Sequence, residues 1–203
     1  LSYAQQQMWT LDQLNPGSLS YTVPNIMQFT IKVDHRVMEK TLTQITERHE
    51  ILRTTFSAID ADPFQVIHEP EPLSLVLDDL SVIPEAVRQK AVEKKIRTQL
   101  RQPWDLENGP LFRHRLIKLE ESHFILVMSL HHIVTDGRSM GILSNEIKVL
   151  YNALINGRTS PLKPLEIQYA DYAIWQKDWL KGDKLVPQIQ YWQSKLEETQ
   201  VLE

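Results

Sequence analysis

The feature of this sequence that most restricts the fold is the segment that spans residues 124–137. It begins with the apolar run FILVMSL at residues 124–130 and continues directly into HHIVTDG at residues 131–137. Because the run lacks the alternation of a half-exposed strand, it predicts a strand that is covered on both faces. The Asp-Gly pair then predicts a turn into a helix, so polar side chains should gather where a buried strand ends.

The surrounding pattern predicts a sheet covered by helices. LFRHRLIKL at residues 111–119 and HFILVMSL at residues 123–130 are separated by a few polar residues, which is typical of an antiparallel hairpin. Hydrophobic periodicity predicts further strands at residues 23–31, 51–56, 64–69 and 73–80, and helices at residues 2–14, 35–50, 84–102, 137–156, 168–180 and 185–198. We therefore expect an α/β fold, in detail an α+β sandwich with a mixed, largely antiparallel sheet.

Composition excludes several classes of protein. The formal net charge is −4 over 203 residues and the basic residues are scattered, so we expect no nucleic-acid partner. The chain has no cysteine, which excludes disulfides and a cysteine nucleophile and fits the reducing cytoplasm. The longest apolar run is far too short to span a membrane, and the N-terminus lacks the pattern of a signal peptide. We therefore expect a cytoplasmic protein with no membrane partner.

His131 and His132 lie next to each other at the end of the expected strand. Neighbouring residues on a strand point to opposite faces, so one imidazole should point into the structure and the other into a cleft. Metal sites need three or four convergent ligands, which this spacing does not supply, so we expect no metal. An imidazole held at a strand end is suited to proton transfer near neutral pH. The spacing leaves open the alternative that both are core residues followed by an ordinary helix start.

Asp136 and Gly137 follow on the turn into the next helix. A carboxylate in that place can cap backbone N–H groups or pair with an arginine. Glycine permits a positive φ, and without a side chain its N–H can approach a ligand closely. The pair therefore suits either a helix cap or one wall of a binding site.

Four collinear segments resemble the first four core motifs of condensation domains of non-ribosomal peptide synthetases. They are SYAQQQMWTL at residues 2–11, RHEILRTTF at 48–56, SLHHIVTDGRS at 129–139 and YADYAIW at 169–175. The third resembles the His-His-x3-Asp-Gly signature of the chloramphenicol acetyltransferase-like superfamily. The resemblance covers the whole chain, but a complete domain of this family is about twice as long and has two lobes. It implies that residues 1–203 are the N-terminal lobe, cut from a longer protein that contains the C-terminal lobe.

The resemblance implies an acyltransferase-type enzyme that forms amide bonds in non-ribosomal peptide synthesis. A carrier-bound aminoacyl or peptidyl thioester is the donor, and the amine of a carrier-bound aminoacyl group is the acceptor. No cofactor binds the domain directly, because the substrates arrive on the 4′-phosphopantetheine arms of upstream and downstream peptidyl carrier proteins. Further partners are the missing lobe and an adenylation domain. The isolated lobe should be inactive or weakly active, because it supplies only one wall of the substrate tunnel.

The family's site residues carry over by motif. His132 takes the catalytic position, where it removes a proton from the attacking amine or holds that amine in place. Gly137 takes the position whose backbone N–H stabilises the developing oxyanion. His131 takes a position regarded as structural.

Asp136 takes another structural position, and the resemblance implies an ion pair with an arginine of the second motif. Arg48 and Arg53 are the two candidates.

The sequence departs from the family pattern at Arg138, where tryptophan is commonest, and at Gln7, where the first motif usually has arginine. Neither departure removes a chemical group that the reaction needs.

Two other functions remain open. An epimerisation domain of the same superfamily uses the same histidine motif, although RHEILRTTF is closer to the condensation version. A non-catalytic module that only docks carrier proteins is the third hypothesis, and the intact HHIVTDG argues against it. The fourth motif and the segments after it resemble domains that accept a donor ending in a D-residue.

Aromatic and histidine residues elsewhere in the chain also have simple structural interpretations. His49 and His114 lie within patterned elements and are expected to be structural. Four of the five tryptophans are expected in the core or between the lobes; they are Trp9, Trp175, Trp179 and Trp192.

Overall fold

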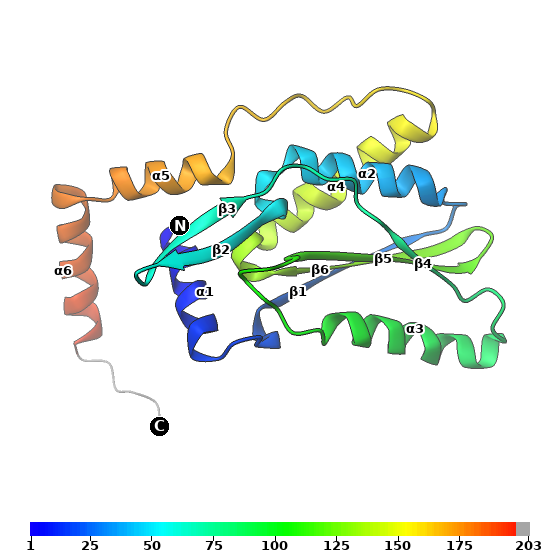
Figure 1. The fold of residues 1–203 in the computed structure, drawn as a ribbon, viewed down its shortest axis with the longest axis horizontal. Helices are drawn as coiled ribbons and strands as arrows, with labels where there is room; N and C mark the ends of the chain where they lie inside the picture. The colour runs from blue at the N-terminus through cyan, green and yellow to red at the C-terminus, as the bar shows by residue number, and fades with distance from the viewer. Residues whose placement is uncertain (198–203) are drawn as a thin grey trace.

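The computed structural model describes residues 1–197, in which one sheet lies between two layers of helices (Figure 1). Its strands are β1 (Thr22–Phe29), β4 (Val76–Asp79), β5 (Phe112–Glu120) and β6 (His123–His131). Their order is β1-β6-β5-β4. The β1–β6 and β6–β5 pairs are antiparallel, whereas β4 and β5 are parallel. The mixed, largely antiparallel sheet and the β5–β6 hairpin are therefore as predicted.

Helices cover both faces of this sheet. Helices α2 (His35–Arg48) and α4 (Gly137–Ile155) lie on one face, and α3 (Glu85–Leu100) lies on the other (Figure 1). Helix α1 (Tyr3–Leu14) lies at one end of the sheet, near the last residue of β6. Helices α5 (Tyr169–Trp179) and α6 (Leu185–Leu196) extend away from the sheet. The expected helix at 185–198 is confirmed to Leu196, and its residue 198 lies outside the described residues.

Strand β6 is the centre of the core. Every residue after His123 on this strand is buried. The even-numbered residues from Phe124 to Leu130 pack with side chains of α2 and α4, whereas Ile125 and Val127 pack with side chains of α3. Apolar residues are therefore needed at successive positions, which explains why the strand shows no alternation.

Strands β2 (Thr54–Ile59) and β3 (Asp62–Ile67) form a separate antiparallel hairpin. The strand predicted at residues 51–56 was wrong at its start, because Glu50–Arg53 form a 3-10 turn, η2. In this turn the Leu52 N–H donates to the carbonyl oxygen of His49, 3.0 Å away. Ile51 and Leu52 are apolar because this turn packs them against the main core, and not because they belong to a paired strand.

The tryptophans of α5 and α6 do not belong to the core of this lobe. Trp175, Trp179 and Trp192 are 54%, 44% and 59% exposed, whereas Trp9 is partly buried against the main core. A core position was therefore wrong for the three later tryptophans, and their place between two lobes stays a prediction. No helix within residues 1–197 has the length and apolar character needed to cross a membrane.

Candidate active site

The two adjacent histidines face opposite sides, as the strand geometry predicts. His131 is the last residue of β6 and is 0% exposed. His132 begins the short 3-10 turn η3 (His132–Val134), is exposed, and lines an open cleft of about 450 Å³. A cleft of this size can hold a substrate of a few hundred daltons. The structure thus brings His132 to a place where a bound substrate could meet it.

Two hydrogen bonds of the Ile133 backbone hold the η3 turn that contains His132. The Ile133 N–H donates to His131 Nδ1 over 3.1 Å, and Gln5 Nε2 donates to the Ile133 carbonyl oxygen over 3.3 Å. Gln5 is 2% exposed, and its own Oε1 accepts from the Ser2 N–H at the start of α1. The first and third sequence motifs therefore meet at this turn, and α1 fixes the backbone from which His132 projects.

Burial keeps His131 neutral. Removal from water, together with the smaller effects of the nearby charges of His132 and Arg113, lowers the pKa of its imidazole to about 4. Nδ1 accepts a hydrogen bond, so the proton of the neutral ring is on Nε2, for which residues 1–197 supply no acceptor. The rings of Tyr21 and Trp104 lie 5.9 and 5.8 Å from the imidazole. His131 therefore shapes the turn and is shielded from the cleft.

The cleft is lined mainly by apolar side chains, with a few polar groups among them. Its walls come from α1, η2, η3, α4 and the segment at residues 165–172. The apolar lining includes Met8, Ile51, Leu52, Leu130, Ile142, Leu143, Leu165 and Ile167; the polar lining includes Gln5, His49, His132, Asp136, Ser139, Gln168 and Tyr169. Polar contacts in such a site are few, so each one restricts how a substrate can lie.

Asp136 is the N-cap of α4. Its Oδ1 accepts from the backbone N–H and from the hydroxyl of Ser139, both over 2.7 Å. These two bonds, with the backbone contribution larger, lower the pKa of the Asp136 carboxyl. A carboxylate in this place also interacts favourably with the helix dipole.

The expected ion pair between Asp136 and an arginine was wrong within residues 1–197. Arg48 Nε lies 3.1 Å from Glu146 Oε1, and Arg53 Nη2 lies 3.4 Å from Glu50 Oε1. The physical reason is that α4 supplies its own carboxylate, Glu146, opposite the end of α2, while Asp136 is occupied by the first turn of α4.

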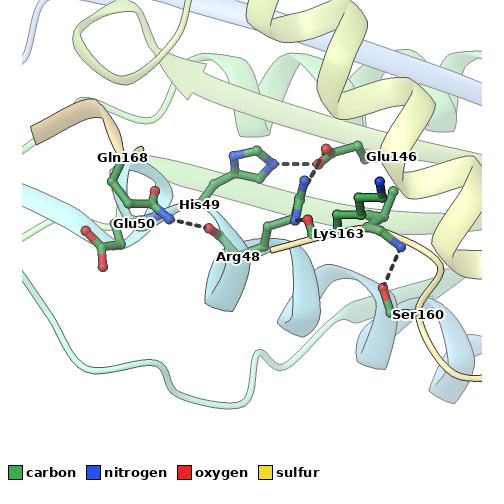
Figure 2. A network of polar contacts seen from close by, with 8 residues as sticks. Arg48, His49, Glu50, Glu146, Ser160, Lys163 and Gln168 are labelled. Carbon is green, nitrogen blue, oxygen red and sulfur yellow. Dashed lines mark hydrogen bonds and ion pairs between the residues drawn. The ribbon is translucent and has the colours of Figure 1, made fainter. Parts of the chain in front are cut away.

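Glu146 joins Arg48 and His49 in a cluster between α4 and the end of α2 (Figure 2). Both Glu146 oxygens accept from Arg48 Nε, and Oε2 also accepts from His49 Nε2 over 2.5 Å. Arg48 donates in addition to the backbone carbonyl of Lys163, so the segment before α5 is tied to the same cluster. The cluster therefore holds one wall of the cleft together.

Gly137 is the first residue of α4 and is exposed beside the cleft. It is not among the glycines with positive φ, so the conformational reason that the sequence suggested does not apply. A Cβ atom built at this position would meet nothing within 4 Å. The atoms of this chain therefore do not require glycine here.

The described residues contain no group of three or more histidine, aspartate or glutamate side chains that could hold a metal ion.

Sequence reasoning missed Glu146, Gln168 and Tyr169 as parts of the site. Glu146 could have been found, because it lies between Leu143 and Leu150 on the apolar face of α4, where a carboxylate requires a basic partner. Tyr169 is the first residue of the fourth motif, which marked the segment but not its contact with the cleft, and Gln168 had no comparable signal. Tyr169 reaches Ser2 Oγ over 2.9 Å across 167 residues, a contact that only the folded chain reveals.

Solved structures establish the class of fold. The starter condensation domain of rhizomide synthetase superposes with a TM-score of 0.89 at 24% identity, over 98% of this chain and 45% of that one. The first condensation domain of the CDA synthetase superposes with a TM-score of 0.84 at 21% identity, over 98% of this chain and 50% of that one. The chain thus has the fold of one part of a condensation domain and spans about half the length of those domains.

The model of the condensation domain family matches residues 1–203, and the chain belongs to that family. A linear gramicidin synthase protein of Brevibacillus parabrevis is 43% identical over 97% of this chain, which corresponds to 2% of that protein. Chondramide synthase of Chondromyces crocatus is 37% identical over 100% of this chain, which corresponds to 5% of that protein. The chain therefore spans a small part of the curated relatives it matches.

Proposed function

We propose that residues 1–203 are the N-terminal lobe of a condensation domain that joins a carrier-bound thioester donor to a carrier-bound amine acceptor. The single observation that carries this proposal is the position of His132, which the HHIVTDG turn presents to the cleft at the end of β6. Family membership over the whole chain and relatives that include a linear gramicidin synthase protein and a phosphinothricin tripeptide synthetase support the same reaction class. The lack of cysteine agrees with direct transfer, without an acyl-cysteine intermediate.

In the proposed reaction, the acceptor nitrogen attacks the carbonyl carbon of the thioester. The new C–N bond forms, the C–S bond breaks, and one proton passes from the nitrogen to the leaving thiolate. His132 is the imidazole that takes and returns this proton. A neutral amine is already a good nucleophile toward a thioester, so much of the acceleration comes from holding the two reactants together.

Gly137 is the proposed donor to the developing oxyanion. Its N–H belongs to the first turn of α4, where backbone N–H groups have no acceptor within the helix. The positive end of the helix dipole favours negative charge at the same place. The space beside Gly137 allows a thioester oxygen to approach the backbone closely.

The partners follow from the reaction. We propose that 4′-phosphopantetheine arms of upstream and downstream carrier proteins deliver both substrates, and that an adenylation domain of the same synthetase loads the acceptor. The rhizomide synthetase domain is described in complex with C8-CoA, and coenzyme A ends in the same thiol-bearing arm. We place the reaction in the cytoplasm, which the cysteine-free sequence supports.

The test uses the complete two-lobed domain that contains this chain, with donor-loaded and acceptor-loaded carrier proteins. Intact-protein mass spectrometry follows product on the acceptor carrier for wild type and for His132→Ala with confirmed fold. We expect amide-linked product from the wild type and a loss of about 10- to 1000-fold in rate in the variant, the lower part of that range if positioning dominates. A wild type that only inverts a loaded residue, or only binds carriers, would replace this function by epimerisation or docking.

A further inference from the structure

A second imidazole lines the same cleft as His132. His49 follows the last residue of α2 and precedes η2, and both His49 and His132 belong to the cleft wall. The sequence pattern suggests only a structural role for His49. Its position in the fold places it instead among the few polar groups of a mainly apolar cleft.

The orientation of the His49 ring is fixed. Its Nε2 lies 2.5 Å from Glu146 Oε2, and Glu146 is itself only 8% exposed. Gln168 holds the backbone on either side of His49: its Nε2 donates to the Arg48 carbonyl oxygen over 2.9 Å, and its Oε1 accepts from the Glu50 N–H over 3.2 Å. Figure 2 shows these contacts around the ring. A ring restrained at both backbone and side chain offers its remaining nitrogen in one direction.

The remaining nitrogen, Nδ1, has no hydrogen-bond partner within residues 1–197 and points away from Glu146 (Figure 2). The Glu146 carboxylate also bonds to Arg48 and acts as the acceptor in both contacts, so His49 Nε2 is the donor toward it. A neutral imidazole that gives its Nε2–H to a carboxylate carries a lone pair on Nδ1. His49 therefore presents a hydrogen-bond acceptor.

We propose that His49 is a substrate-contacting residue, and that its Nδ1 accepts a hydrogen bond from an N–H of the aminoacyl or peptidyl group in the cleft. The proposal rests on the proposed function and adds a binding contact to it. Amine and amide N–H groups lose water when they enter an apolar cleft, and a fixed acceptor offsets that loss. His132 meets the reacting centre, whereas His49 sets how the substrate lies beside it.

Two substitutions separate this role from a structural one. In His49→Asn the amide reaches the place of Nδ1 and loses the contact with Glu146, whereas in His49→Gln the amide reaches the place of Nε2 and loses the group at Nδ1. We expect His49→Gln to raise the KM for one of the two loaded carriers about 2- to 10-fold, the loss expected for one hydrogen bond. We expect kcat to change less, and His49→Asn to stay closer to wild type.

The measurements are steady-state rates of the two-lobed domain with each carrier varied in turn, at a temperature where circular dichroism shows every variant folded. His35 is the first residue of α2, the helix that ends just before His49, and it is not part of the cleft wall. Its ring also makes one hydrogen-bond contact, with the Leu75 carbonyl oxygen, so His35→Asn and His35→Gln are the controls. Equal KM values for all variants, or a larger loss in His49→Asn than in His49→Gln, would overturn the proposal. If the wild type itself forms no amide product, the proposed function fails instead, which distinguishes the two outcomes.

Discussion

Glu146 shows at the scale of single residues how one buried charge organises a wall of the cleft. It is a carboxylate on the apolar face of α4, and Arg48 and His49 both bond to it. Partly buried charges of this kind contribute little net stability as a set, but each becomes costly when its partner is removed. The cluster therefore matters more for holding α2, α4 and the cleft in one arrangement than for total stability.

We expect Glu146→Ala to lower the free energy of unfolding by about 2 to 4 kcal/mol, because the Arg48 charge would be left without its carboxylate. Urea unfolding measures the loss. Glu120→Ala is the matched control, since the Glu120 side chain is 62% exposed in its pair with Arg88. We expect that control to cost less than about 1 kcal/mol. Equal losses of unfolding free energy in both variants would show that the Glu146 cluster stabilises the fold no more than an exposed ion pair does.

Helix α5 carries a row of aromatic side chains, several of them exposed. Tyr169, Tyr172, Trp175 and Trp179 form a ladder along it, with ring centroids 5.5, 5.9 and 5.6 Å apart in turn. The ladder starts at the cleft, where Tyr169 and Tyr172 are part of the wall, and continues onto the exposed part of the helix. Exposed apolar patches of this kind mark contact surfaces. Solved condensation domains contain about as much chain again as this lobe, and we propose that this further part covers the ladder.

We expect Trp175 and Trp179 to be oxidised less by hydroxyl radicals in the two-lobed domain than in the folded 203-residue chain. The reason is that the second lobe would remove the two rings from water. Peptide mass spectrometry reads out the modification, and Trp104, which is 4% exposed here, should change little. Equal oxidation of Trp175 and Trp179 in both proteins would contradict this placement of the second lobe.

The pH dependence of stability belongs to the whole molecule, because it sums the groups that folding removes from water. Burial lowers the pKa of His131 and of His114 from 6.5 to about 4. The unfolded chain therefore takes up protons at these rings below about pH 6.5, while the folded chain does not until about pH 4. Their contribution is fully present above pH 6.5 and is lost as the pH falls through this window.

We expect the free energy of unfolding to fall by roughly 1 to 3 kcal/mol per ring between pH 6.5 and pH 4. The lowered pKa of Asp136 acts at lower pH, below its ordinary value of 3.8, so the two effects are separable. Urea unfolding at pH 8, 6 and 4.5 measures the fall, and His114→Leu should flatten it. A stability that is constant down to pH 4.5 would show that neither imidazole is held neutral.

Much of this fold could be predicted from the sequence, because its signals are local. The apolar run at residues 124–130 specifies a strand buried on both faces. His131 ends that strand and is buried, and His132 begins the turn that follows and faces the cleft. Helix periodicity found α1, α2, α3 and α4 to within a few residues, since each packs one apolar stripe on a core. The family and the position of the site follow from such short patterns.

Only the tertiary structure decided which charged groups meet. The sequence offered Arg48 and Arg53 as partners of Asp136, but Arg48 pairs with Glu146, 98 residues away, and Asp136 caps α4. The sequence could not show the surroundings of His49 for the same reason. Its partner Glu146 lies on α4, and the cleft that His49 lines is formed by several separate segments. Apolar runs and helix periodicity are patterns of neighbours along the chain, whereas the pairing of side chains depends on distances across the fold that no local pattern encodes.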